Sequence, residues 1–494
     1  MAEYDVIVVG AGNAALAAAM SARESGASRV LVLEKAPEEA RGGNTHYSGG
    51  LLRIAFDDPR DLEPLLPDVE REVPGFYDGV EPYTADDFRA DLMRVTRGKT
   101  DQGLADILIS RSFDTIRWMH EHGQVPMEAA VSLAGIRVGD RIRFQKGAIV
   151  RAHHEGVGLS TSWFRTTERA GCEIRYGTAA IDLVRARSGR VVGVRASSDA
   201  GIEEIEARAV VLGCGGFEGN PMMRAQYLGA PWDHAKVRGT AYNQGDGLRM
   251  ALALGAQPWG QWSGCHSTPI SNEWPDFADR ERTDRSNRLS YPYGVMINRE
   301  GLRFLDEGED LGLYTYAKTG GTILRQPGAL AWQIFDQKTI HLLEPRYATS
   351  QPIEAETLEA LVDKLEIDDR ARAVRTLHAY NEAARDPDGF DPSRRDGLAT
   401  RGLEPAKSNW ALRLDSPPFV AYSATGGITF TFGGVRIDEA ARVIGTDWRP
   451  IPGLYACGEM VGGLFHFNYP GGTGLVSGAV FGRIAGRSAA SANT

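Results

Sequence analysis

Continuous apolar runs that end close to a glycine recur along the chain. Residues 4–9 read Tyr-Asp-Val-Ile-Val-Val before Gly10, and residues 30–33 read Val-Leu-Val-Leu. Residues 209–212 and 453–456 repeat the pattern, each with a glycine within two residues of its end. Runs of this length without polar alternation are typical of parallel strands that are buried on both faces. We therefore expect a central parallel sheet whose strands end in turns where a ligand can approach the backbone.

Helical periodicity marks other segments. A helix is predicted at 14–25, between the first two strands, and another at 247–254, where Gly255 provides the C-terminal cap. Two more are predicted near 355–364 and 369–384, where apolar residues recur at three- and four-residue intervals. The aromatic stretch at 258–275 has few strand signals and suits a hinge. The tail at 488–494 is expected to be irregular.

The turn after the first strand carries a dinucleotide-binding pattern. It reads Gly-x-Gly-x-x-Ala, formed by Gly10, Gly12, Asn13, Ala14 and Ala15. The first glycine permits a tight turn, the second lets a pyrophosphate approach the backbone, and the alanine keeps the helix close to the sheet. The anion would lie at the N-terminus of that helix. Glu34 ends the second strand, where a carboxylate can accept hydrogen bonds from a ribose diol and repel a 2′-phosphate.

Composition indicates an α/β protein of two domains. The 494 residues, of which 42% are hydrophobic, exceed one compact core. The 55 basic and 65 acidic side chains give a net charge of −10, which argues against nucleic-acid and anionic-membrane partners. No signal peptide or bilayer-length apolar stretch is evident, so a cytoplasmic protein without a membrane span is expected. Four scattered cysteines form no metal-binding motif, so no metal site is predicted.

Further glycine segments indicate a cofactor larger than a nicotinamide dinucleotide. The second strand leads straight into a loop that contains Gly42, Gly43, Asn44, Thr45, Ser48, Gly49 and Gly50. The side chains of Asn44 and Thr45 can donate hydrogen bonds to phosphate or ribityl oxygens. Two later strands end in Cys214-Gly215 and Gly458-Glu459. Because the carboxyl ends of parallel strands meet at a ligand, these segments are expected to converge on one cofactor.

These motifs resemble the flavoprotein subunits of fumarate reductase and succinate dehydrogenase, with their relatives the 3-ketosteroid dehydrogenases and urocanate reductases. The resemblance spans residues 10–486 and includes Gly42-Gly43-Asn44, Gly245-Asp246-Gly247, the Arg-Phe-Leu-Asp-Glu segment at 303–307, Gly458-Glu459 and residues 480–486. Within the superfamily, the segments at 10–16, 36–44, 238–243, 306–310 and 427–432 are most similar to tricarballylate dehydrogenases.

The resemblance implies FAD as the cofactor. Its implied contacts also include Lys35, Ala180, Gly474, Leu475 and Val476. Succinate dehydrogenases tether FAD through a histidine in a Ser-His-Thr motif, whereas His46 here stands in Asn-Thr-His-Tyr. We therefore expect FAD to be bound non-covalently.

The resemblance also implies an α/β fold in which a Rossmann-like FAD-binding domain of the glutathione-reductase type is interrupted by an α+β cap domain. The FAD-binding domain is expected at 1–260 and 425–494, and the cap at 261–424. The hinge-like stretch after Gly255 marks the first boundary, and the prolines at 417–418 mark the second, after a loop that begins at Asp386. The substrate is expected where the two domains meet.

Four segments supply candidate catalytic residues. His266 matches the histidine with which fumarate reductases hold a substrate carboxylate. Fumarate reductases have a proton-donating arginine shortly after the segment 303–307, whereas this chain offers Tyr314, Tyr316 or Lys318. Their paired histidines are replaced by Thr429 and Phe430. Tyr469 stands in a Tyr-Pro-Gly motif and matches the base of ketosteroid dehydrogenases, not the carboxylate-clamping arginine of fumarate reductases.

These residues suggest an α,β-dehydrogenation of a CH–CH unit next to a carbonyl group. Tyr469 would accept the α-proton, the flavin a hydride, and Tyr314 or Tyr316 would stabilise the enolate oxygen together with backbone N–H groups at 471–474. His266 would orient the substrate. A separate electron acceptor, a quinone or a redox protein, is expected.

Three alternatives are open for the function, and they differ in the substrate. The first is a carboxylic acid such as tricarballylate, although unpaired buried carboxylates are costly unless Arg238, Lys318 or Arg151 reaches the site. The second is a desaturase or ene-reductase that acts on a ketone or a steroid-like carbonyl compound. The third is a flavin protein that only carries electrons.

Overall fold

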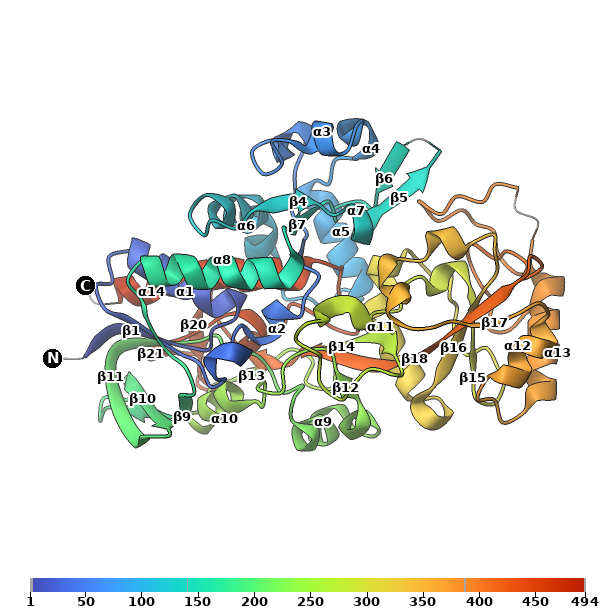
Figure 1. Ribbon diagram of the computed structural model, residues 1–494. Helices are drawn as coiled ribbons and strands as arrows, with labels where there is room; N and C mark the ends of the chain where they lie inside the picture. Colours follow the sequence, from blue (N-terminus) through green and yellow to red (C-terminus); the bar gives the residue numbers. More distant parts are fainter. Residues whose placement is uncertain (1–2, 140, 386–387, 493–494) are drawn as a thin grey trace.

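The computed structural model describes residues 3–139, 141–385 and 388–492 and shows a mixed α/β fold (Figure 1). Its larger sheet, in these residues, has eight strands: β1 (Tyr4–Val9), β2 (Val30–Leu33), β8 (Glu173–Arg175), β9 (Ala179–Arg185), β10 (Val191–Ser198), β11 (Gly201–Leu212), β20 (Arg442–Ile444) and β21 (Pro450–Ala456). The central order is β20-β21-β11-β1-β2-β8.

The predicted parallel strands form the centre of this sheet. β1 pairs in parallel with β11 and β2, so that Val8 lies opposite Val211 on one side and Val32 on the other. β21 pairs in parallel with β11. All three valines are buried, as expected for strands covered on both faces. The carboxyl ends of the strands therefore meet at one edge, as the sequence pattern predicts.

The helices α1 (Asn13–Glu24), α8 (Glu155–Arg169) and α14 (Thr473–Ser491) lie on one face of the larger sheet, and α1 and α14 lie side by side. The other helices of the described residues are α2 (Gly43–His46), α3 (Val69–Glu72), α4 (Phe76–Gly79), α5 (Ala85–Val95), α6 (Gln102–Glu121), α7 (Val131–Ala134), α9 (Pro221–Leu228), α10 (Asp246–Ala253), α11 (Gly312–Leu324), α12 (Leu358–Lys364) and α13 (Arg370–Ala383). In Figure 1, α8 and α14 flank α1 above the sheet.

Glycines allow α14 to approach α1 closely. A Cβ added at Gly482 would lie 2.4 Å from the carbonyl oxygen of Ala14, and one at Gly486 would lie 2.0 Å from that of Ala18. Because no side chain intervenes, the backbones of the two helices are in direct contact. This contact holds the N-terminus of α1 beside the N-terminus of α14.

The second sheet is built around one long strand, β18 (Phe419–Thr431). In the described residues it has six strands, the others being β12 (Lys236–Val237), β14 (Cys265–Ser271), β15 (Val295–Asn298), β16 (Ala331–Phe335) and β17 (Ile353–Ala355). Except for β15, which pairs with β16, each of them pairs with β18. Figure 1 shows β18 running from the larger sheet toward α12 and α13.

Shorter ladders complete the structure. They are formed by β3 (Leu51–Leu52), β7 (Val150–Ala152) and β4 (Met127–Ala129), by β5 (Gly135–Val138) with β6 (Arg141–Phe144), and by β13 (Pro258–Trp259) with β19 (Gly434–Val435). The pairing of β13 with β19 joins two segments that are far apart in the sequence. The division into two domains stays a prediction, and β18 crosses its expected boundary at residue 424 without interruption.

The prediction that residues 258–275 contain few strands is wrong, while their role as a hinge stays a prediction. β14 occupies the middle of this segment and is buried at every residue. Its sequence, Cys-His-Ser-Thr-Pro-Ile-Ser, lacks the apolar alternation of a half-exposed strand because both of its faces are covered. α11 packs on one of them, where a Cβ at Gly320 would lie 2.4 Å from the carbonyl oxygen of Thr268.

The predicted helices are confirmed, with ends displaced by a few residues. The irregular tail is wrong for residues 488–491, because α14 continues to Ser491 with Ala489 buried. The last two residues of that tail and the start of the loop predicted from Asp386 lie outside the described residues. Within the described ranges, no helix has the length and apolar character needed to cross a bilayer.

Candidate active site

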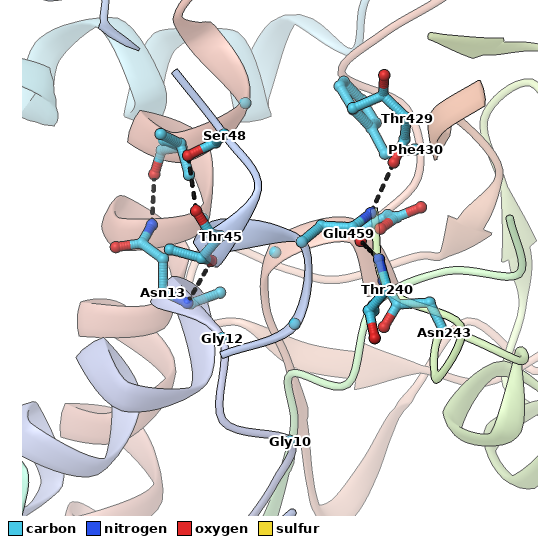
Figure 2. A pocket seen from close by; sticks show the side chains of 18 of the residues that line it. Gly10, Gly12, Asn13, Thr45, Ser48, Thr240, Asn243, Thr429, Phe430 and Glu459 are labelled. Carbon is cyan, nitrogen blue, oxygen red and sulfur yellow. Dashed lines mark hydrogen bonds between the residues drawn. The ribbon is translucent and has the colours of Figure 1, made fainter. Parts of the chain in front are cut away.

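A cavity opens at the carboxyl ends of β1, β2 and β11 and extends to β18 and α11. Most of the residues that the sequence proposed for cofactor binding line it: Gly10, Gly12, Asn13, Ala14, Glu34, Lys35, Gly43, Asn44, Thr45, Ser48, Gly49, Gly50, Ala180, Cys214, Gly215, Gly458, Glu459, Gly474 and Leu475. Tyr316 and Tyr469 line it as well. Figure 2 shows Asn13, Thr45 and Ser48 on one side of the Gly10–Gly12 turn, with Thr240, Asn243 and Glu459 on the other.

Five of the proposed site residues do not line the cavity: Ala15, Gly42, Val476, Tyr314 and His266. Ala15 lies under the first turn, where a Cβ at Gly213 would be 3.0 Å from its Cα atom. This matches the helix-to-sheet contact expected of that alanine. Gly42 precedes α2 in the left-handed conformation, with φ at 104°.

The turn between β1 and α1 is shaped to receive a phosphate-bearing cofactor. Gly10 has φ at +98°, and a Cβ there would lie 2.7 Å from the carbonyl oxygen of Gly213, so only glycine fits. A Cβ at Gly12 would instead meet no atom closer than 3.4 Å, and one at Gly43 none closer than 4.0 Å. At these two positions a side chain would occupy the space into which a ligand can approach.

Glu34 is held at the far end of the cavity by backbone groups. Its carboxylate accepts hydrogen bonds from the N–H groups of Ala11, at 3.0 Å, and Ala36, at 2.8 Å. Burial raises the pKa of Glu34, while these hydrogen bonds oppose the shift. Lys35 next to it pairs with Asp246 at 2.7 Å. The buried carboxylate is thus oriented so that its remaining lone pairs can accept hydrogen bonds from a ribose diol.

Asn13 and Thr45 join the first turn to the second glycine loop. The backbone N–H of Asn13 donates to Thr45 Oγ1 at 2.9 Å, and its side-chain amide donates to the carbonyl oxygen of Leu475 at 2.8 Å. Trp163 Nε1 donates to Asn13 Oδ1 at 2.8 Å. Asn13 therefore connects α1, α2 and α14 at the cavity wall.

The amide of Asn44 is taken up by protein partners. Its Nδ2 donates to Glu218 Oε1 and to the carbonyl oxygen of Thr429, both at 2.7 Å, and its Oδ1 accepts from the N–H of Thr240 at 2.9 Å. Asn44 thus positions the loop that contains Thr240. The sequence predicted that the Asn44 side chain donates hydrogen bonds to phosphate or ribityl oxygens. In the structure, both of its amide hydrogens donate instead to Glu218 and to the carbonyl oxygen of Thr429.

Tyr316 and Tyr469 form a hydroxyl pair in the cavity. Their Oη atoms are directly hydrogen-bonded, and both side chains are buried. α11 carries Tyr316, while Tyr469 lies in the loop before α14. That loop is anchored to α11, because Asn468 Nδ2 donates to the carbonyl oxygen of Tyr314 at 2.6 Å and the N–H of Gly471 donates to that of Leu313 at 2.9 Å.

Burial raises the pKa of both tyrosines. The pKa of Tyr316 is raised well above 10.0, first by burial and then by the charge of Tyr469. Burial also raises the pKa of Tyr469, but the hydrogen bond from Tyr316 and the charge of Arg238 oppose that shift. Because the two hydroxyl groups share a hydrogen bond, each can stabilise the ionised form of the other.

His266 lies behind the tyrosine pair in an aromatic enclosure. Its ring stacks on Phe430 with centroids 5.1 Å apart, and it meets Tyr316 and Tyr469 edge to face at 4.8 Å each. Neither ring nitrogen has a hydrogen-bond partner in the described part of the chain. Burial, followed by the charge of Arg238, lowers the pKa of His266 well below 6.5, so the ring is neutral.

Tyr314 points away from the cavity, although it is only two residues from Tyr316. Its hydroxyl donates to Asp91 Oδ2 at 2.6 Å and accepts from Arg53 Nη1 at 3.1 Å. Of the two tyrosines that the sequence left open, Tyr316 is the one that faces the cavity.

Of the three cationic side chains that the sequence analysis proposed as carboxylate partners, only Arg238 reaches the cavity. Arg238 lines the cavity. Lys318 pairs with Glu309 at 2.6 Å, and Arg151 pairs with Glu128 at 2.6 Å, both outside the lining. Asp284 and Arg346 also line the cavity beside Arg238, although the sequence did not indicate either of them. Both follow from long-range folding, and no local motif marks them.

Thr240 and Asn243 were also missed as lining residues. They fall within residues 238–243, a segment already noted for its resemblance to tricarballylate dehydrogenases. That resemblance could have identified both residues as part of the site. Glu218, which binds Asn44 behind the lining, had no sequence signal beyond its place after Gly215 and Gly216.

Comparisons with known proteins agree with the cofactor fit. The chain is 29% identical over 492 residues to the probable fumarate reductase Ifc3 of Shewanella frigidimarina, which covers 98% of this chain and 74% of that protein. It is 28% identical over 573 residues to 4-oxocyclohexanecarboxylate 2-dehydrogenase of Sinomonas cyclohexanicum, which covers 99% of this chain and 93% of that protein.

A structural neighbour shares the mixed α/β fold. The structure of 3-ketosteroid Δ1-dehydrogenase from Sterolibacterium denitrificans, in complex with 1,4-androstadiene-3,17-dione, has a TM-score of 0.75 at 20% identity and covers 99% of each chain. A family model described as "FAD binding domain" matches residues 5–476. Because that match covers nearly the whole chain, the protein belongs to the FAD binding domain family, in the fumarate reductase/succinate dehydrogenase flavoprotein superfamily, and is an enzyme with FAD as its cofactor.

Proposed function

We propose that the enzyme oxidises a CH–CH unit next to a carbonyl group, or catalyses the reverse reduction. The observation that carries this proposal is the hydroxyl pair of Tyr316 and Tyr469 in the wall of the cavity that also contains the glycine turns. FAD, when bound, supplies the two-electron acceptor or donor for such a reaction. The relatives named above as a fumarate reductase and a 2-dehydrogenase support the same reaction class.

Tyr469 is the proposed proton acceptor at the α-carbon. Burial raises its pKa, and the hydrogen bond with Tyr316 and the charge of Arg238 oppose that rise. The phenolate form of Tyr469 would accept the α-proton, and Tyr316 would stabilise that phenolate by donating a hydrogen bond to it. Once Tyr469 is protonated, the hydroxyl group of Tyr316 can donate to the enolate oxygen. His266 is neutral and enclosed, so its proposed role is to position the two tyrosine rings and not to bind a carboxylate.

The reacting end of the proposed substrate is an uncharged carbonyl group. Phe430 and Phe465 line the cavity close to Tyr469, with ring centroids 5.3 Å and 5.4 Å from it. An ionised carboxylate against these rings would lack a counter-ion, whereas a ketone would need only the tyrosine hydroxyl groups. Tricarballylate is a second candidate because Arg238 and Arg346 also line the cavity.

FAD would be held non-covalently, because His46 is buried and its Nε2 contacts the carbonyl oxygen of Arg280 at 3.2 Å. The FAD-binding domain would comprise 1–260 and 425–494, and the cap 261–424. Electrons would pass to or from a separate quinone or redox protein.

Anaerobic titration of the purified holoenzyme tests the proposal. The panel comprises 4-oxocyclohexanecarboxylate, cyclohexanone, tricarballylate and succinate, and loss of the flavin absorbance band reports reduction. We expect Tyr469→Phe to lower the rate constant of that loss by about 10²- to 10⁴-fold. Tyr422→Phe, in the separate aromatic cluster with Phe335 and Tyr347, is the matched control. An unchanged rate constant in Tyr469→Phe would overturn the assignment of the base.

A further inference from the structure

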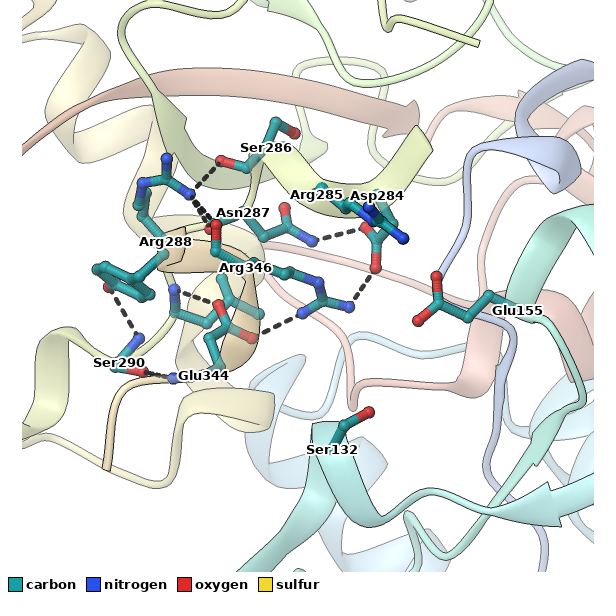
Figure 3. Close-up of polar contacts among 12 residues, drawn as sticks. Ser132, Glu155, Asp284, Arg285, Ser286, Asn287, Arg288, Ser290, Glu344 and Arg346 are labelled. Atoms are coloured by element: carbon teal, nitrogen blue, oxygen red, sulfur yellow. Dashed lines mark hydrogen bonds and ion pairs between the residues drawn. The ribbon is translucent and has the colours of Figure 1, made fainter. Parts of the chain in front are cut away.

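Three charged side chains from distant parts of the chain meet at the cavity wall. Arg238 follows β12, Asp284 lies in the loop after β14, and Arg346 lies in the loop after β16. Asp284 is 1% exposed, and its two carboxylate oxygens each bind a different guanidinium group: Oδ1 that of Arg238 and Oδ2 that of Arg346. Figure 3 shows Arg346 extending between Asp284 and Glu344.

The cluster contains more guanidinium groups than carboxylates. Arg346 also pairs with Glu344 at 2.7 Å. Arg288, fully buried beside them, donates to the carbonyl oxygens of Asn287 and Arg346 and to the hydroxyl group of Ser350. Within the described residues it has no carboxylate partner. Glu155 faces the cluster from the opposite side but pairs with Arg151 at 3.1 Å.

Two nitrogen atoms of the cavity-lining arginines remain without an acceptor in the described part of the chain. They are Nη2 of Arg238 and Nε of Arg346; the other recorded bonds of these side chains go to Asp284, Glu344 and Thr429. Because both side chains line the cavity, an anion inside it can take these donors without displacing Asp284.

The cluster is next to the proposed catalytic tyrosines. Arg238 Nε donates to Thr429 Oγ1 at 3.0 Å, and Thr429 directly precedes Phe430 on β18. The charge of Arg238 acts on both Tyr316 and Tyr469. A ligand with an anionic group at Arg238 and Arg346 can therefore place another of its groups at the tyrosine pair.

We propose that Arg238 and Arg346 bind a carboxylate of the substrate, with Asp284 as an internal counter-ion that orients both guanidinium groups before the substrate arrives. This inference rests on the proposed function and specifies its substrate class, an oxo acid. The carbonyl group of such a compound lies at the tyrosine pair, and its carboxylate lies away from the reacting carbons. Asp284 also limits the affinity of the site, because its negative charge repels the incoming carboxylate.

A pair of ligands that differ only in charge tests the proposal. The probes are 4-oxocyclohexanecarboxylate and 4-oxocyclohexanecarboxamide, titrated into the FAD-loaded enzyme under anaerobic conditions and followed by calorimetry and by the flavin spectrum. We expect Arg346→Met to raise the dissociation constant of the carboxylate about tenfold and Asp284→Asn to lower it about tenfold. The carboxamide should respond to neither change.

Opposite effects of the two substitutions separate binding from structural damage, because a disrupted cluster would weaken binding in both variants. Lys318→Met removes a positive charge of the same region outside the cavity and should leave both dissociation constants unchanged. Should Arg346→Met fail to fold, Arg346→Lys with Asp284→Asn provides the same contrast, since lysine keeps the charge but loses the planar fork.

The outcomes distinguish this inference from the proposed function. If no ligand bleaches the flavin while the carboxylate still binds in an Arg346-dependent way, the proposed reaction fails and the carboxylate site stands. If the wild-type enzyme binds the carboxylate no better than the carboxamide, or binds neither the oxo acid nor tricarballylate, the carboxylate site is wrong. An unchanged dissociation constant in both Arg346→Met and Asp284→Asn would also overturn it.

Discussion

The buried carboxyl groups of Glu218 and Glu459 lie close together, and the charge of Glu218 raises the pKa of Glu459. Glu218 is fully buried, and its Oε2 has no hydrogen-bond partner in the described residues. Thr431 donates to Glu459 through its N–H and its hydroxyl group. Burial raises the pKa of both carboxyl groups, and the charge of Glu218 raises that of Glu459 further, well above 4.5.

This pair predicts a loss of stability with rising pH. In the unfolded chain each carboxyl group titrates near its ordinary value, whereas the folded protein retains a proton to higher pH. The stabilisation is therefore complete below the unfolded pKa and is lost as the pH rises through the folded pKa, by about 1.4 kcal/mol for each unit of difference.

Glu218→Gln should flatten that dependence, because it removes one of the two buried carboxyl groups and the charge that raises the pKa of the other. The measurement is the free energy of unfolding of the holoenzyme in urea between pH 5 and pH 9. The exposed Glu206→Gln, on β11, is the control. A slope in Glu218→Gln equal to that of the wild type would show that the pair does not hold a proton in this range.

Tyr316→Phe should shift the pH dependence of the reaction. The hydrogen bond from Tyr316 lowers the pKa of Tyr469, so its removal should raise that pKa. If Tyr469 is the base, the rate constant of flavin reduction rises with pH until the phenol ionises, and the rising limb should move to higher pH in the variant.

Stopped-flow absorbance with 4-oxocyclohexanecarboxylate measures the rate constant of flavin reduction over a range of pH, and thereby the position of this rising limb. Tyr293→Phe is a matched control, because its hydroxyl donates to the carbonyl oxygen of Pro392 away from the cavity. A limb that stays in place in Tyr316→Phe would mean that Tyr469 is not the titrating group.

Gly482→Ala should destabilise the protein by about 1–3 kcal/mol, because its methyl group would lie 2.4 Å from the carbonyl oxygen of Ala14 and force α14 away from α1. Gly478→Ala, one turn earlier, places its methyl group at an ordinary 3.4 Å from Ala14 Cβ. That variant should be neutral or slightly more stable, since alanine favours the helix. Urea unfolding of both variants gives the comparison, and equal stabilities would contradict it.

Much of the larger sheet could be predicted because its signal is local. The apolar runs that became β1 and β2, and the glycines between them, follow each other directly, so strand, turn and helix can be recognised without tertiary information. β14 could not be predicted, because the pattern of its residues reflects tertiary contacts on both faces of the strand. His266, Ser267 and Thr268 are polar residues that would ordinarily indicate an exposed loop, yet all three are buried in it.

The same distinction applies to the candidate site. Gly10, Gly12 and Glu34 lie where their spacing predicted, because one strand-turn-helix unit positions all of them. Tyr316 could not be separated from Tyr314 by sequence, since the choice depends on which face of α11 meets β14 and β18. Asp284 and Arg346 join Arg238 only through the packing of three distant loops, so no spacing in the chain could indicate them.

The contact between α1 and α14 has a consequence for biosynthesis. The strand, turn and helix that begin the nucleotide site are translated before α14, which supplies Gly474 and Leu475 to the same cavity. The alanine-rich face of α1 must therefore stay uncovered while the intervening chain is translated. FAD can be captured in its complete site only after translation has passed α14.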